Sequence, residues 1–253
     1  MKAWQIFTHS LRQVTGNIGP ALRISGVLFV VQVAVTLLLS RSMALAMVEG
    51  EGAPGGAAFG KLLLALLVML VTSLWIAVAW HRYVLREEEA SGPLPLFRGD
   101  RMLAYFGTGL LISLIVIVPA VLVGMVAGFV IGGMMRSALP SLAGVLVLQA
   151  VVQTVLGALI LRLSAILPGV ALEPGHKIRD AWNATSGETG TFFGLAFICA
   201  MALLLVTVIS LALQRFGLVG TGWEIVAQWM VTMVGVSILT TLYGHYIEKR
   251  PLV

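Results

Sequence analysis

One run without charged residues limits what this chain can fold into. Residues 62–80 contain no Asp, Glu, Lys or Arg across 19 positions. As a helix with a rise of 1.5 Å per residue, the run is about 28 Å long, close to the roughly 30 Å of hydrocarbon in a bilayer. Backbone amides in lipid can be satisfied only within their own segment, so the run must be helical. It predicts a transmembrane helix.

The composition extends this prediction to the whole chain. Hydrophobic residues make up 59% of the 253 residues and charged residues only 11%, with a mean hydropathy of +1.01. These values exclude an ordinary soluble domain. We therefore expect an all-α, polytopic membrane protein that forms a single integral membrane domain over residues 1–253. Its six predicted spans cover residues 22–44, 62–82, 103–128, 142–161, 191–213 and 225–246.

Two further segments are predicted to be amphipathic helices on the membrane surface. In residues 3–17, Trp4, Phe7 and Leu11 recur at helical spacing, and polar side chains occupy the other faces. Residues 177–187 combine basic residues with Trp182 in the same way. Such helices lie in the headgroup layer with their apolar face toward the acyl chains.

The third span is ambiguous. Residues 102–135 contain no charge over 34 positions, which is about 51 Å of helix and too long for one upright crossing. Either the span tilts, or it ends near Gly128 and the remainder lies in the far interface. Pro119 is expected to bend it, because proline removes a helical hydrogen bond.

The basic residues predict the orientation. With six spans, one face receives twelve of the sixteen Lys and Arg residues and the other receives four: Arg41, Lys61, Arg136 and Arg215. An excess of positive charge marks the cytoplasmic side, so both ends of the chain are expected there. Anionic lipid headgroups are the partners expected for these basic residues, whereas a nucleic acid is not expected.

An aromatic and basic cluster closes the second span. Trp80, His81, Arg82 and Tyr83 stand together at its end, and Trp182 lies in the second surface helix. Aromatic rings with a polar edge favour the headgroup layer, and a guanidinium can reach the phosphates there. These residues are predicted to be cytoplasmic interface anchors. The alternative is a catalytic or ligand-binding role for His81.

Three glycines predict a packing surface. Gly124, Gly128 and Gly132 recur every four residues, so they share one face of the third span. Small residues at this spacing allow another helix to approach closely. The partner is expected to be a helix of the same chain, of a second copy in an oligomer or of another membrane protein.

Polar residues inside the spans are few. Gln149 and Gln153 stand four residues apart on one helix face. Carboxamides at membrane depth need partners, so we expect hydrogen bonds between helices. The alternative is a polar path lined by these two residues together with Gln32 and Gln228.

Short matches suggest internal repeats and a family. Gly16-Asn17-Ile18-Gly19 precedes the first span as Gly187-Glu188-Thr189-Gly190 precedes the fifth, which suggests three related hairpin units. At residues 77–85 (AVAWHRYVL), 162–168 (RLSAILP) and 181–185 (AWNAT), the chain resembles a poorly characterised group of alphaproteobacterial polytopic membrane proteins.

The resemblance has limited consequences. More loosely, the chain is similar to the membrane domain fused to glycerophosphodiester phosphodiesterases, and residues 185–188 depart from the pattern of the group. The resemblance implies a location in the bacterial inner membrane and no assigned chemistry. Phosphodiesterase activity does not carry over, because this sequence contains no phosphodiesterase barrel.

These patterns favour a non-catalytic role. The four histidines are far apart, and no two share the spacing of metal ligands. We therefore expect no enzyme activity, cofactor or metal. The span centres lack the ionisable residues that coupled transporters use. The predicted function is an inner-membrane scaffold, assembly factor or lipid-interacting subunit. The alternative is a permease for a lipid or small solute with a Gln/Thr-lined path.

Overall fold

The computed structural model describes residues 1–48, 56–88, 92–137 and 142–252. The elements in these ranges are helical: α1 Lys2–Thr15, α2 Ile18–Val48, α3 Gly56–Arg86, α4 Gly99–Ser137, α5 Leu142–Ser164, α6 Leu167–Leu172, α7 Ile178–Ala184, α8 Thr189–Leu213, the 3-10 helix η1 Gln214–Phe216 and α9 Leu218–Tyr246. Within these ranges, six helices are long and apolar enough to cross a membrane: α2, α3, α4, α5, α8 and α9. The predicted all-helical, multi-pass architecture is confirmed at this level.

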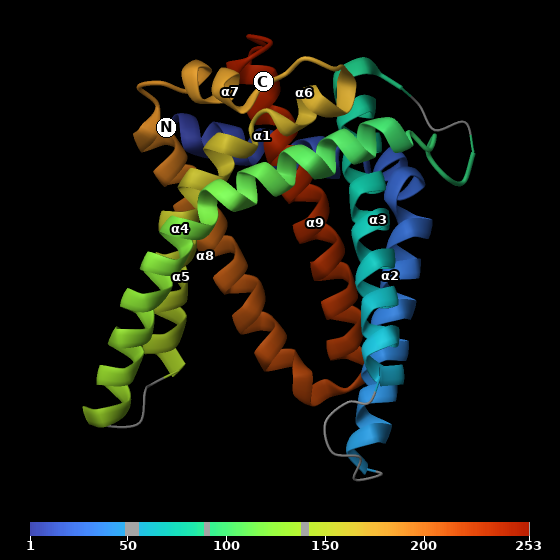
Figure 1. Cartoon of the computed structure of the whole chain (residues 1–253), viewed down its shortest axis with the longest axis vertical. Coiled ribbons are helices and arrows are strands. Elements are labelled where there is room, and N and C mark those ends of the chain that lie inside the picture. The colour runs from blue at the N-terminus through green and yellow to red at the C-terminus, as the bar shows by residue number, and fades with distance from the viewer. Residues whose placement is uncertain (49–55, 89–91, 138–141, 253) are drawn as a thin grey trace.

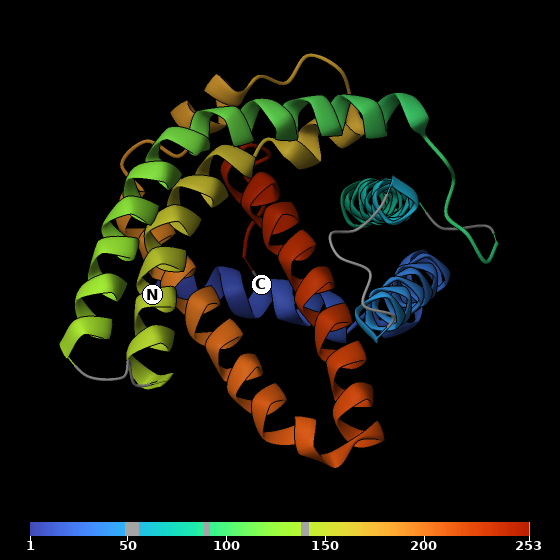
Figure 2. The same cartoon turned by 60° about the horizontal axis from the view of Figure 1, so that its bottom comes forward.

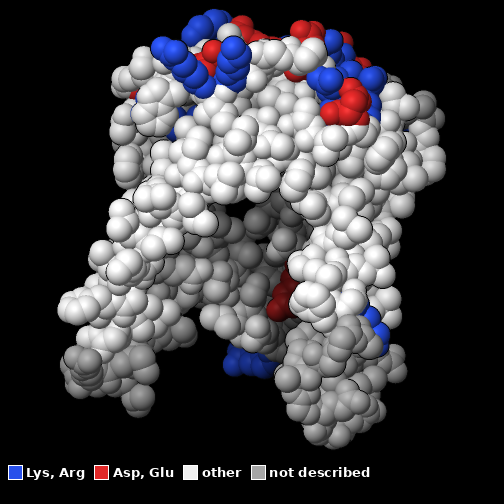
Figure 3. All heavy atoms as spheres, viewed as in Figure 1, with Lys and Arg blue, Asp and Glu red and all other residues white. Residues whose placement is uncertain are grey.

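Most of the charged residues visible in Figure 3 lie at one end of the molecule. Both ends of the chain lie there, together with α1, α6 and α7 (Figure 1). We call this end the cap: α1, α6, α7 and the adjoining ends of α3, α4, α8 and α9. From the cap, α4 and α5 descend as one leg, and α2 and α3 descend as another (Figures 1 and 2). The α8–α9 hairpin descends between them.

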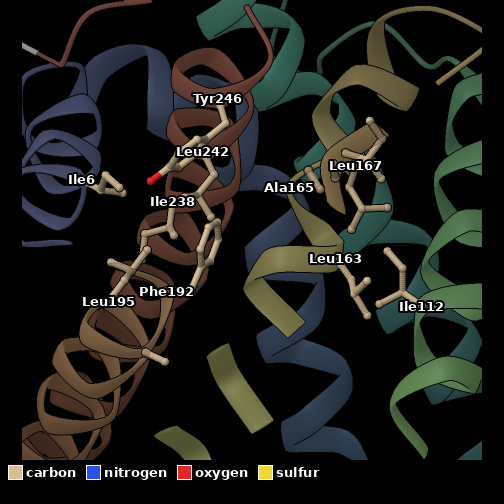
Figure 4. Close-up of a cluster of buried hydrophobic side chains, with 14 of the residues drawn as sticks. Ile6, Ile112, Leu163, Ala165, Leu167, Phe192, Leu195, Ile238, Leu242 and Tyr246 are labelled. Atoms are coloured by element: carbon tan, nitrogen blue, oxygen red, sulfur yellow. The ribbon is translucent and has the colours of Figure 1, made fainter. Parts of the chain in front are cut away.

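The hydrophobic core lies in the cap. One cluster of buried side chains extends from α1, α8 and α9 to α4, α5 and α6 (Figure 4). It includes Ile6, Phe192, Leu195, Ile238 and Leu242 on one side and Ile112, Leu163, Ala165 and Leu167 on the other. The legs are buried far less. Of the most apolar 18-residue stretch of each helix, only 11% is buried in α4 and in α5, and 28% in α2 and in α3.

Helix α1 packs on the protein through one of its apolar faces. Ile6 and Val14 are fully buried, against α8 and α9 for Ile6 and against α2, α3 and α9 for Val14. Trp4 is exposed and stacks on Phe7 with ring centroids 5.9 Å apart. The apolar residues that predicted a surface helix are thus divided between the protein interior and its surface.

Helix α6 is not among the predicted elements, which leave residues 162–176 without a helix. Residues 163–172 are all buried. The stretch is apolar but too short to show helical periodicity, which is why its helix is not predicted. Arg82 donates from one guanidinium nitrogen to the carbonyl oxygens of Ala171 (3.1 Å) and Leu172 (3.2 Å). These bonds satisfy carbonyls that a helix end leaves free.

Two boundaries also differ from those expected. Helix α4 is continuous over Gly99–Ser137, with Pro119 near its middle, and it changes direction along its length (Figure 2). It therefore neither ends at Gly128 nor stays straight, as a proline inside a long helix explains. The helix of the sixth span, expected over residues 225–246, is longer than predicted, because α9 already begins at Leu218.

Gly169 in α6 tests how tightly the cap is packed. A Cβ on Gly169 would lie 2.5 Å from Cε2 of Tyr243 and 3.1 Å from Cδ2 of His176. We expect Gly169→Ala to lower the unfolding free energy by about 1–3 kcal/mol, the usual cost of overpacking. Thermal unfolding in mild detergent measures this change. The control is Gly107→Ala in α4, where the added methyl meets nothing within 4 Å. Equal melting temperatures for the two variants would contradict this description of the cap.

Candidate functional site

The end of α3 forms the polar centre of the cap. His81 is fully buried, and its Nδ1 lies 2.8 Å from Oγ1 of Thr240 in α9. Its Nε2 lies 3.2 Å from the hydroxyl of Tyr105 in α4, and the two rings stack with centroids 5.7 Å apart. One imidazole thus bridges α3, α4 and α9.

The hydrogen bonds assign a proton to each member of this cluster. The Thr240 hydroxyl donates to the carbonyl oxygen of Val236 at 2.9 Å, so its oxygen accepts from His81 Nδ1–H. The Nε2 of a neutral imidazole is then an acceptor, and the Tyr105 hydroxyl donates to it. Both ring nitrogens are occupied while this chain of bonds is intact, which leaves neither to bind a metal or move a substrate proton.

Trp80 ties the same turn of α3 to α9. Its ring is fully buried, and its Nε1 donates to Oγ of Ser237 at 2.8 Å. The prediction that Trp80 and His81 anchor the protein in the headgroup layer is therefore wrong, because packing against α9 removes both rings from lipid. Tyr83 is half-buried, and its hydroxyl donates to Oδ1 of Asn17 at 3.4 Å.

Arg82 is also engaged inside the cap. Its guanidinium pairs with Glu88 at 2.6 Å, and Glu88 also pairs with Arg98 at 2.9 Å. Burial raises the pKa of Glu88, but hydrogen bonds and charge from the two arginines outweigh it and hold that pKa below its ordinary value. With Arg82 also bound to α6 carbonyls, the prediction that it reaches lipid phosphates is wrong as well.

Trp182 in α7 is the exposed member of the predicted anchors. Its side chain is 43% exposed, and the guanidinium of Arg162 lies 3.7 Å from its ring centroid. Arg162 also donates to Oγ1 of Thr185 at 2.9 Å, which holds the stack in place. The role of Trp182 as an interface anchor stays a prediction.

The glycine stripe of α4 has no helix packed on it within the described chain. Gly124, Gly128 and Gly132 are exposed, and a Cβ at any of them would meet nothing within 4 Å. The intrachain form of the packing prediction is therefore wrong, and contact with another molecule stays a prediction. Sequence reasoning could place these glycines on one face but could not say which neighbour that face meets.

The four glutamines do not form one site. Gln32 is buried and donates to Oγ1 of Thr72 (2.9 Å) and Oγ of Ser73 (3.0 Å), which joins α2 to α3. Gln149 and Gln153 lie on α5, and Gln228 lies on α9. No hydrogen bond joins any two of the four in the part of the chain that the structure describes. The bonds between helices were predicted for Gln149 and Gln153, and neither makes one within the described residues.

An apolar groove separates α4 from α5. Its volume is about 330 Å³, and its lining consists of Leu, Val and Ala only: Leu122, Val123, Val126, Ala127, Leu148, Val151, Val152 and Val155. A hollow also opens below the cap, between the α4–α5 and α2–α3 legs (Figure 3). The groove was missed because it depends on how far two helices diverge, which the hydropathy of either helix does not record.

No family model, curated protein or solved structure matches this chain. The resemblance at residues 77–85, 162–168 and 181–185 therefore stays a prediction. Among the described residues, no three His, Cys, Asp or Glu side chains lie where they could hold one metal ion.

The His81 bridge can be tested by a double-mutant cycle. His81→Leu leaves the Tyr105 hydroxyl buried without its acceptor, so we expect a loss of about 1–3 kcal/mol of unfolding free energy. Tyr105→Phe should cost less alone and almost nothing in the His81→Leu background, because the shared bond is already gone. Unfolding in mild detergent measures all three variants. His245→Leu is the matched control, because His245 is half-buried and its Nδ1 lies 3.1 Å from the carbonyl oxygen of Arg250. Additive effects of the two substitutions would disprove the bridge.

Proposed function

We propose that this protein is a non-catalytic, multi-pass component of the bacterial inner membrane that binds phospholipid. The acyl chains occupy the apolar groove between α4 and α5, and the cap meets the headgroups. The groove is the observation that carries the proposal, because its lining of eight Leu, Val and Ala side chains selects for an alkyl chain.

The groove has the size and chemistry of an alkyl site. Its volume of about 330 Å³ is at the lower end of ligand pockets, which run from roughly 300 to 1,000 Å³. Pockets for polar ligands carry a few polar groups that fix orientation, and none of the eight lining residues has one. An acyl chain needs no such group, since it is held by dispersion and shape alone.

The charged cap supports binding at the cytoplasmic leaflet. Several basic residues near the cap make no ion pair with another described residue: Arg12, Arg23, Lys177 and Arg179. The ion pairs of the described residues are those of Lys2, Arg82, Arg86, Arg98, Arg101 and Arg250. Each basic residue near an anionic surface contributes about 1 kcal/mol to membrane attraction. Together with the charge bias of the loops, these residues support the proposal that the cap and both ends of the chain lie in the cytoplasm.

The proposal also covers how the helices lie in the membrane. Helices α1 and α7 lie in the cytoplasmic headgroup layer, with Trp4 and Trp182 as their exposed aromatic residues. The sequential hairpins α2–α3, α4–α5 and α8–α9 are the three units that the proposed repeat comprises. A scaffold or assembly role is compatible with the same lipid contacts.

A permease draws less support. A Gln/Thr-lined path would need the glutamines to converge, but Gln32 is buried between α2 and α3 and hydrogen-bonded there. The groove that does exist has no polar lining. We therefore favour lipid binding over solute passage.

Filling the groove tests this function. Val126 lines it, so Val126→Phe should displace the acyl chain and lower the lipid retained per protein to about half or less. Native mass spectrometry after purification in mild detergent measures the retained phospholipid. Val121→Phe is the matched control. It makes the same change on the same helix at an exposed residue outside the groove. Equal lipid retention by the two variants would rule out the groove as the lipid site.

A further inference from the structure

Two glutamines lie at the middle of the membrane on α5. Gln153 and Gln149 precede Arg162, the basic residue in the last turn of α5, by nine and thirteen residues. At 1.5 Å per residue they lie about 14 and 20 Å from the charged end, on either side of the roughly 15 Å half-thickness of the hydrocarbon. In the part of the chain that the structure describes, no other glutamine side chain is both this close to the middle of the hydrocarbon and at least partly exposed.

The chain itself leaves these carboxamides without partners. Gln149 is exposed and Gln153 is half-buried, and neither side chain makes a hydrogen bond within the described residues. The contrast with Gln32 is informative, because its amide is buried and bonded to two hydroxyls of α3. Gln228 is exposed too, but it lies eighteen residues from Tyr246, about 27 Å along α9, where interfacial water can reach it.

The face that carries Gln149 is turned away from α4 and from the closest contact of α5 with α8. On a helix with about 100° per residue, Gln149 points roughly 110° away from the centre of the groove-lining residues. It points about 80° away from Gly157, where an added Cβ would lie 3.4 Å from the Cβ of Ala196 in α8. Val145 and Ile160 share the face of Gln149 and are 37% and 41% exposed. The result is a third face of α5, apolar at both ends with two carboxamides at its centre.

This pattern selects among possible neighbours. Acyl chains cannot bond to an amide, so lipid alone leaves the carboxamides unsatisfied at the depth where that is most costly. A water-filled path would be expected to have polar neighbours, whereas Val145 and Ile160 are apolar. Another protein helix with donors and acceptors at the same depth meets both requirements.

We propose that the partner is a second copy of this chain, paired through the Gln149 and Gln153 face of α5. A carboxamide offers both an acceptor and two donors, so it is complementary to itself. A two-fold axis along the membrane normal brings the glutamines of both copies to the same depth by symmetry. The two α5 helices then run parallel, with glutamine pairs at the centre and Val145 and Ile160 packed above and below. This dimer does not depend on lipid in the α4–α5 groove.

Two measurements in liposomes test the dimer. Energy transfer between differently labelled copies reports association, and the double variant Gln149→Leu, Gln153→Leu should weaken it about tenfold, as expected when bonds between membrane helices are lost. Gln228→Leu makes the same change on α9 and should leave association unchanged. An unaltered melting temperature of the double variant shows that the fold is intact.

Cross-linking gives an independent result that does not require removal of the glutamines' bonds. In a Cys199→Ser background, Val145→Cys, on the same face as Gln149, should form an oxidised dimer, whereas Val147→Cys, an exposed residue on another face, should not. A monomeric wild-type protein, or a double variant that associates as tightly as wild type, would overturn the proposal. So would labelling of Gln149→Cys by a membrane-impermeant maleimide, because that result requires an aqueous path along this face.

Discussion

The fold depends on satisfying the polar side chains that the last turns of α3 bring into the protein. His81 bonds to Thr240 and Tyr105, Trp80 bonds to Ser237, and Arg82 closes the end of α6. Each of these groups would be costly to bury alone, since an unpaired polar group away from water costs far more than a bond contributes. Because their partners lie on α9, α4 and α6, the bonds form only when those helices meet. They therefore specify the arrangement of the cap as well as stabilise it.

Within the described chain, the legs lack such a network of buried polar side chains joining several helices. Below the cap, helices meet through few buried side chains, and in lipid there is no hydrophobic gain in bringing two apolar helices together. Helices held at one end are then free to diverge, which leaves the α4–α5 groove, the glycine stripe and the glutamine face open on their surfaces. In our proposals, the cap holds the helices together at one end, and the legs present such surfaces to lipid and to a second copy.

The sequence predicted the features that a single helix determines by its own hydropathy and residue spacing. The six long helices followed from hydropathy, and the polar face of Gln149 followed from spacing. Features that require a neighbour were not predictable. Trp80, His81 and Arg82 have the composition of a headgroup girdle, and only their contacts with α9 and α6 make them an internal cluster. Gly124, Gly128 and Gly132 have the spacing of a helix contact, yet no helix of the described chain reaches them. Helix α6 has too few residues to show a period.

The central claim is that helices joined at the cap diverge toward the other side of the membrane. Spin labels in lipid nanodiscs can measure this directly in a Cys199→Ser background. One labelled pair, Ile160 and Val84, joins α5 to α3 near the cap, and the other, Val147 and Leu64, joins them far from it. Divergence predicts a longer distance for the far pair than for the cap pair, as Figures 1 and 2 show for these helices. An equal or shorter far-pair distance, as in a bundle whose neighbours stay about 8–10 Å apart throughout, would contradict the account.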